Sequence, residues 1–205
     1  MKVALHDAEF ANGYPNLALM KLSAWHKSVG YNVGWFTPGV EDYSFVFSSK
    51  VFSFTPDPAL PEWVLKGGTG YSRVDGPVLP HHIDTICPDF LLYGCDKSYG
   101  FLTRGCPNKC SWCFVPEKEG AIRPYQDIED FARHKEVVLM DNNVLACDHG
   151  IHQIEKIISL GLKVDFNQGL DARLIDNSVA KLLGRVKWLH PIRLACDSTP
   201  MVESV

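Results

Sequence analysis

The chain has 205 residues, of which 46% are hydrophobic, 21% charged and 11% aromatic, a composition that excludes disordered, fibrous and coiled-coil proteins. With 20 Lys and Arg against 24 Asp and Glu, the net charge is −4, so the strong basic field that favours nucleic acid is missing. The first residues contain no secretion signal, and no apolar run is long enough to span a bilayer. We therefore expect a cytoplasmic protein, with neither a membrane nor nucleic acid indicated as a partner.

The first part of the chain reads as alternating strands and a helix. A predicted strand over residues 2–6 is followed by a helix that Gly30 ends in a left-handed conformation. The apolar residues expected on one face of that helix are Ala18, Leu22, Trp25 and Val29. Further strands are predicted over 33–36 and 45–47, and residues 51–54 are another candidate.

A glycine-rich turn, Gly67-Gly68-Thr69-Gly70, follows these strands. Such a turn lets the backbone approach something closely, and it is equally consistent with a plain tight connection. We assign residues 1–74 to a first α/β domain, residues 75–98, rich in Pro, His and Gly, to a linker, and residues 99–205 to a second domain.

The second domain repeats a unit of one strand followed by one helix. Strands are predicted over 99–103, 137–140, 163–166 and 192–195, and helices over 151–160 and 177–183. Alternation of this kind is typical of parallel strands joined by helical crossovers.

Polar residues follow each of these four strands. In chain order they are the clustered cysteines, then Asp141-Asn142-Asn143, then Asn167-Gln168, and then Cys196-Asp197-Ser198. Because the carboxyl ends of parallel strands share one edge, we expect these residues to meet in a binding site. The alternative for any one of them is that it starts a loop or caps a helix.

Three of the seven cysteines lie within eight residues, with the spacing C-x3-C-x2-C: Cys106, Cys110 and Cys113. In a reducing cytosol such a group indicates metal binding rather than a disulfide. Three thiolates from one loop can hold three irons of a [4Fe–4S] cluster and leave the fourth iron open.

Two other interpretations of the cysteines stay open. A structural zinc site would need a fourth ligand, for which Cys95, His81 and His82 are candidates, although their separations match no common zinc spacing. The three cysteines could also be buried or incidental thiols.

With Trp112 directly before Cys113, the group matches the pattern C-x3-C-x-Φ-C, and the chain resembles the radical S-adenosylmethionine (radical SAM) superfamily. The resemblance implies that Cys106, Cys110 and Cys113 ligate the cluster, whose open iron chelates the methionine moiety of S-adenosylmethionine. It implies an enzyme that cleaves this cofactor reductively to a 5′-deoxyadenosyl radical. The electron would come from a donor such as a flavodoxin or ferredoxin, and the substrate is not identified by the sequence.

The resemblance also implies a set of cofactor-binding residues near the strand ends. They are Trp112, Phe114, Asp141, Asn142, Asn143, Asn167, Gln168, Arg173 and Asp197. The three residues from Asp141 occupy the position that contacts the methionine amino group, Arg173 could pair with its carboxylate, and Trp112 could stack on the adenine. The alternatives are a surface salt bridge for Arg173 and a place in the core for Trp112 and Phe114.

Residues 99–205 resemble about four of the six units of a radical SAM (β/α) barrel, and residues 1–74 resemble a short Rossmann-like domain. Such domains often bind cobalamin, which stays open here although the fingerprint Asp-x-His-x-x-Gly is absent. The missing units suggest an alternative function, a non-catalytic iron–sulfur module or one part of a split or truncated protein. A partner chain would then complete the barrel.

Overall fold

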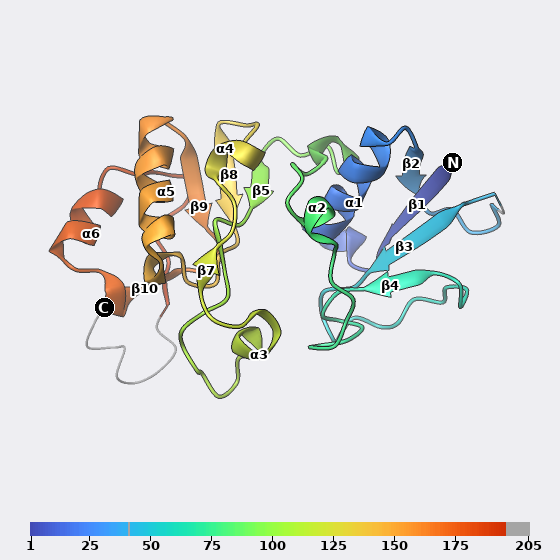
Figure 1. Ribbon diagram of the computed structural model, residues 1–205, viewed down its shortest axis with the longest axis horizontal. Helices are drawn as coiled ribbons and strands as arrows, with labels where there is room; N and C mark the ends of the chain where they lie inside the picture. Colours follow the sequence, from blue (N-terminus) through green and yellow to red (C-terminus); the bar gives the residue numbers. More distant parts are fainter. Residues whose placement is uncertain (41, 196–205) are drawn as a thin grey trace. The chain divides into compact units, whose positions relative to one another are not determined.

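A computed structural model describes residues 1–40 and 42–195 of the chain (Figure 1). It divides the chain into two compact units, the first ending at Cys95 and the second beginning at Asp96. Each unit contains a four-stranded parallel sheet, so the expected α/β class is confirmed. Among the described residues, no helix has the length and apolar character needed to cross a membrane.

The sheet of the first unit has the strand order β2-β1-β3-β4. Its strands are β1 (Lys2–Asp7), β2 (Asn32–Trp35), β3 (Phe45–Ser49) and β4 (Leu65–Gly67). The chain adds strands on both sides of β1, so β1 lies inside the sheet. Val3, Ala4 and Leu5 on β1 are all fully buried, because both faces of a central parallel strand are covered. Residues 51–54 are not a strand in the structure.

The helix α1 (Leu17–Ser28) begins at Asn16, whose side chain accepts a hydrogen bond from the Leu19 N–H. It packs Leu19 and Leu22 onto the sheet, and Gly30 follows it with a φ of 83°. The predicted apolar face is wrong at its last residue, since Val29 is 47% exposed. Val29 lies beyond the last helical turn, where the chain already leaves the sheet.

The expected linker contains two short helical segments, α2 (His81–Asp84) and η2 (Phe90–Leu92), in addition to η1 (Phe10–Asn12) earlier in the unit. Ile83 and Phe90 are buried. Asp89 accepts hydrogen bonds of 2.6 Å from both Ser23 and Lys27 on α1. Most of this segment therefore packs into the first unit.

The glycine turn after β4 approaches the chain itself. A Cβ on Gly68 would lie 2.3 Å from the Lys50 carbonyl oxygen, and Gly68 has a φ of 100°. The Gly70 N–H donates to the same oxygen at 2.8 Å. The glycines thus permit a tight connection between neighbouring loops.

The sheet of the second unit has the order β11-β9-β8-β5, with all neighbours parallel. Its strands are β5 (Ser98–Gly100), β8 (Glu136–Leu139), β9 (Lys163–Phe166) and β11 (Lys187–Trp188). Each strand is added beside the previous one, so the crossovers proceed in one direction (Figure 1).

Three α-helices accompany this sheet: α4 (Ile128–Phe131), α5 (Asp148–Ser159) and α6 (Asn177–Leu183). Ile154 and Ile157 of α5 are completely buried in the core, with Val137 and Val164 of the sheet. The predicted helix 177–183 has the predicted bounds because the Asp176 side chain accepts from the N–H groups of Ser178 and Val179.

The predicted strand 192–195 does not join the main sheet. Its last residues form β12 (Leu194–Ala195), which pairs with β10 (Leu170–Asp171), and the fourth strand of the sheet is β11 instead. Val186 is buried and the Trp188 ring packs 5.8 Å from the Phe166 ring. Two residues of strand are too few to give a periodic signal in the sequence.

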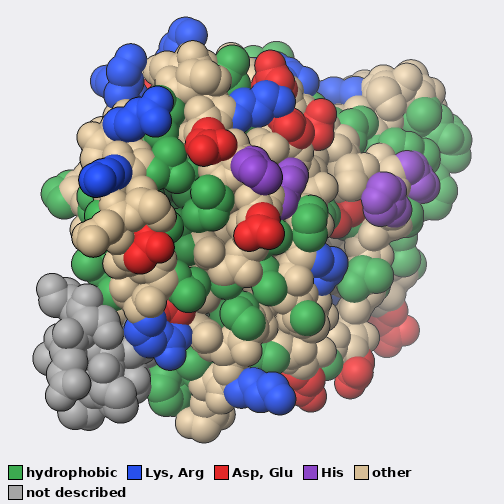
Figure 2. Space-filling model, turned by 60° about the vertical axis from the view of Figure 1, so that its left-hand side comes forward, with side chains coloured by type: hydrophobic (Ala, Val, Ile, Leu, Met, Phe, Trp, Pro, Cys, Tyr) green, Lys and Arg blue, Asp and Glu red, His purple; other side chains and the backbone are tan. Residues whose placement is uncertain are grey.

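The remaining short elements surround the strand ends: β6 (Thr103–Arg104), β7 (Arg123–Pro124), α3 (Val115–Glu119), η3 (Val144–Ala146) and η4 (Ala172–Leu174). On the face drawn in Figure 2, basic and acidic side chains are interspersed with hydrophobic ones. This mixture agrees with the small net charge of −4.

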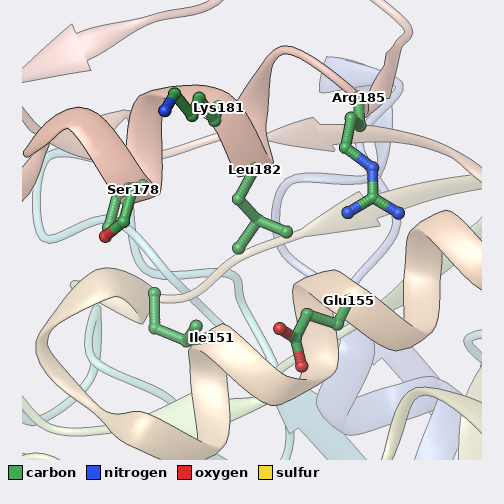
Figure 3. Close-up of a pocket in the computed structure, with 7 residues that line it drawn as sticks. Ile151, Glu155, Ser178, Lys181, Leu182 and Arg185 are labelled. Atoms are coloured by element: carbon green, nitrogen blue, oxygen red, sulfur yellow. The ribbon is translucent and has the colours of Figure 1, made fainter.

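A groove of about 280 Å³ lies between α5 and α6 (Figure 3). Ile151 and Leu182 form its apolar part, and Glu155 and Arg185 lie on opposite walls. Its lining contains no cysteine and none of the predicted cofactor-binding residues.

Candidate functional site: the cysteine loop

The three clustered cysteines lie on a loop whose two ends are joined by a short antiparallel ribbon. Thr103 and Arg104 of β6 pair with Pro124 and Arg123 of β7. At the start of the loop, Gly105 has a φ of 81°, and a Cβ there would lie 2.3 Å from the Ala121 carbonyl oxygen. Glycine is therefore required where the loop closes.

Glu119, the last residue of α3, belongs to the cysteine loop and binds the residues at the start of that loop. One of its carboxylate oxygens accepts from the Arg104 guanidinium at 2.8 Å, and the other accepts from the Gly105 N–H at 2.9 Å and from the Asn142 amide at 3.1 Å. These charge-assisted hydrogen bonds join both ends of the loop to the residues that follow β8. No spacing rule pointed to Glu119, because its partners are distant in the sequence.

Asp171, at the end of β10, connects a second set of groups. Its carboxylate accepts from Asn108 on the cysteine loop at 3.0 Å, from Asn143 at 3.2 Å, and from two nitrogens of Arg173 at 2.6 and 2.8 Å. The hydrogen bonds from Arg173, above all, lower the pKa of Asp171 to about 2. Sequence reasoning missed Asp171 because Asn108 and Asn143 reach it only through the fold.

The thiols of the three cysteines are close enough to influence one another. Burial raises the pKa of the Cys106 thiol, and Cys113 and Cys110 add to this rise, whereas a hydrogen bond from the Asn143 side chain lowers it. None of the described cysteines forms a disulfide. All three thiols of the loop are therefore available as ligands.

Arg173 lies beside the same thiols. Its hydrogen bond to Asp171 raises the pKa of the guanidinium, and Cys110 and Cys106 contribute to the same rise. The salt bridge expected as the alternative for Arg173 is thus present, and it holds a positive charge near two of the cysteines. A nearby cation favours the thiolate form that metal binding requires.

The donor set can be compared with the groups that it could hold. Among the described residues, no three or more His, Cys, Asp or Glu side chains are arranged to hold one metal ion, which is the arrangement that a structural zinc site needs. In a [4Fe–4S] cluster, each cysteine ligates a different iron, so the thiolates do not converge on one atom.

The side chain of Asn143 has a buried polar atom without a partner among the described residues. It is 3% exposed, and its Oδ1 atom is buried without a hydrogen-bond partner in the described structure. Buried polar atoms almost always have partners, and this one belongs to a side chain that contacts Cys106. The donor set therefore consists of three thiols and one unpaired polar acceptor.

Asp141, which was expected near the methionine amino group, binds the backbone and side chain of the segment before the cysteine loop. It is buried, and its carboxylate accepts from the Leu102 N–H at 3.0 Å and from the N–H and hydroxyl of Thr103 at 2.5 and 2.7 Å. Burial raises its pKa to about 6, against the effect of these hydrogen bonds. This carboxylate fixes the turn between β5 and β6, so it is a positioning residue for the cysteine loop.

The two aromatic residues around Cys113 differ in exposure. Trp112 is 60% exposed, so the alternative that it fills the core is wrong. Phe114 is half-buried and lies at the N-cap position of α3.

The other predicted residues lie after β9 or beyond it. The Asn167 N–H donates to the Leu139 carbonyl at 2.9 Å, so these two neighbouring strands end at one edge. Asn167 is half-buried and Gln168 is exposed. Asp197 and the rest of the fourth polar strand end lie outside the described residues. The residues after β8 contact the cysteine loop and its surroundings through Asp141, Glu119 and Asp171. For Asn167 and Gln168 the meeting in one site stays a prediction.

In comparisons with known proteins, no family model matches this chain, and no curated protein matches it. The function is therefore inferred from the site.

Proposed function

We propose that this chain is a radical SAM iron–sulfur enzyme in which Cys106, Cys110 and Cys113 hold a [4Fe–4S] cluster. When bound, the cluster would supply the electron that cleaves S-adenosylmethionine to a 5′-deoxyadenosyl radical. The observation that carries the proposal is a C-x3-C-x-Φ-C loop at the carboxyl edge of a parallel sheet, next to the unpaired buried oxygen of Asn143. In this proposal the second unit is part of a radical SAM barrel, and the first is a Rossmann-like domain.

Burial raises the pKa of Cys106 overall, and two neighbouring groups, Asn143 and Arg173, act in favour of the thiolate. Burial opposes ionisation of Cys106, and the hydrogen bond from Asn143 favours it. Arg173 adds a positive charge near Cys106 and Cys110. Since the thiolate is the metal ligand, these groups would lower the cost of binding iron near neutral pH.

The side chain of Asn143 supports the proposed recognition of an ammonium group. Its amide nitrogen donates to Asp171, which fixes the orientation of the side chain and leaves Oδ1 as an acceptor. The amino group of a methionine moiety is a donor that such an oxygen would accept from. Trp112 offers an exposed ring next to Cys113 on which a purine could stack.

The proposal is tested by anaerobic reconstitution with iron and sulfide. We expect a [4Fe–4S] absorption and electron paramagnetic resonance signal, and 5′-deoxyadenosine after addition of S-adenosylmethionine and dithionite. The triple variant Cys106→Ala, Cys110→Ala, Cys113→Ala should lose both. The matched control is Cys147→Ala, a half-buried cysteine outside the loop, which should keep both.

Two results would overturn the proposal in different ways. Failure of the wild-type chain to bind a cluster would exclude an iron–sulfur site. An intact cluster without 5′-deoxyadenosine would favour the alternative function, a non-catalytic iron–sulfur module.

A further inference from the structure

A cavity of about 510 Å³ lies within the first unit, between α1, the strands β3 and β4, and residues 77–83. Its lining includes the buried residues Leu19, Leu22 and His26, and also the exposed residues Phe45 and Leu65. The cavity therefore extends from the core to the surface. Its volume is in the range of small-molecule sites, which are mostly apolar with a few polar groups.

Aromatic rings surround one side of this cavity. The His26 ring lies 4.7 Å from Trp25, 5.8 Å from Tyr31 and 5.2 Å from Phe47, measured between ring centroids. All four side chains line the cavity. Aromatic walls favour flat aromatic ligands, which make offset-stacked and edge-to-face contacts.

His26 supplies an unused hydrogen-bond acceptor. The residue is 4% exposed, and its Nδ1 lies 2.8 Å from the Leu22 carbonyl oxygen. A carbonyl can only accept, so Nδ1 carries the hydrogen. Burial lowers the pKa of His26, which keeps the imidazole neutral and leaves Nε2 as an acceptor. No described residue donates a hydrogen bond to it.

The two serine hydroxyls in the lining already have partners. Ser48 lies within hydrogen-bond distance of His6 and Tyr71, at 3.0 and 2.8 Å. Ser49 accepts from Asn16 at 2.9 Å. Tyr31 and Lys66 also line the cavity, and both are less buried than His26, so His26 is the buried acceptor that a ligand would meet.

We propose that this cavity binds a flat aromatic heterocycle whose ring N–H donates a hydrogen bond to His26 Nε2. The rings of Trp25, Tyr31 and Phe47 would contact its faces and edges. The cavity contains no residue of the cysteine loop. This proposal and the iron–sulfur proposal can therefore be tested separately.

The test compares indole with 1-methylindole, two flat probes that differ in the N–H donor. Isothermal titration calorimetry of the full chain should show that indole binds roughly five- to tenfold more tightly, the effect of one neutral hydrogen bond. In His26→Phe, which keeps a ring of similar size, this preference should disappear. Leu65→Trp, at an exposed position of the lining, should weaken binding of both probes by filling the opening.

Equal binding of the two probes to the wild-type chain would overturn the proposal, as would failure of both to bind. A preference for indole that persists in His26→Phe would mean that the extra methyl group is excluded by shape, and it would also overturn the proposal. If His26→Phe does not fold, the comparison of the two probes on the wild-type chain and the result for Leu65→Trp still test the proposal. The triple cysteine variant should bind indole as the wild-type chain does.

Discussion

The exposure of Trp112 bears on its proposed role in stacking on the cofactor. An aromatic residue that fills a core is buried, and Trp112 is not. Replacing it by Ala should weaken S-adenosylmethionine binding to the reconstituted protein by about tenfold, or 1.4 kcal/mol, because a stacking surface is lost. Equilibrium dialysis with labelled cofactor measures this change.

Iron content should stay at the wild-type level in Trp112→Ala. Trp63→Ala, which removes a similarly exposed tryptophan from the first unit, serves as the control and should change neither quantity. A parallel loss of iron and cofactor would instead show that Trp112 holds the loop together.

Asp171 predicts a pH dependence of stability. Its folded pKa of about 2 is below the unfolded value of about 3.9, so ionisation favours the folded state. Its stabilising contribution should be complete above about pH 4 and should disappear as the pH falls through 2. Urea unfolding of wild type and Asp171→Asn at several pH values measures this contribution.

At neutral pH, Asp171→Asn should lower the free energy of unfolding by about 1–3 kcal/mol, since donors from Asn108, Asn143 and Arg173 lose a carboxylate. The difference between the two proteins should shrink toward pH 2. A difference that is constant over this range would mean that the charge of Asp171 contributes nothing.

Among the structural elements, the β6–β7 ribbon depends on one glycine. Gly105→Ala combines a left-handed backbone, which costs a non-glycine residue about 1–2 kcal/mol, with a clash against the Ala121 carbonyl. We expect a clear loss of thermal stability and of iron retention after reconstitution.

Gly13→Ala, in the first unit, is the control for the backbone term. Gly13 is also left-handed, with a φ of 69°, but a Cβ there would meet nothing within 4 Å. Its substitution should cost only the backbone term. If the two variants behave alike in differential scanning calorimetry, the close contact at Gly105 is unimportant.

The elements also show what local sequence can predict. The helix 177–183 was predicted to the residue, because Asp176 caps it through neighbouring N–H groups. β11 was missed because two residues carry no periodicity. Glu119 and Asp171 were missed because their partners are brought together only by the fold. The three cysteines were recognised because their spacing is local.

At the scale of the whole molecule, alternating strands and helices predicted the α/β class, and the extent of the first unit was harder to predict. The segment 75–95 is rich in residues typical of loops, and yet Asp89 connects it to Ser23, which is buried on α1. Composition does not reveal such contacts, because they depend on which helix the segment meets.

Asp89→Ala tests whether this contact holds the segment. It leaves the buried Ser23 hydroxyl without its acceptor, so the first unit should lose about 1–3 kcal/mol of stability. Limited proteolysis should then cut within residues 75–95 more rapidly. Asp42→Ala removes an exposed partner of a lysine and should have almost no effect. Unchanged proteolysis of Asp89→Ala would show that other contacts hold the segment.

The contacts of Glu119 have a consequence for how the protein would acquire iron. Arg104, Gly105 and Asn142 all bind this carboxylate, and none of these contacts uses a cysteine thiol, so we expect the loop to keep its shape when iron is removed. Cluster assembly would then proceed on a prepared surface, whereas zinc fingers fold only when the metal binds. Chelation should strip the iron and leave the backbone intact, and the same protein sample should accept a new cluster repeatedly without passing through an unfolded state.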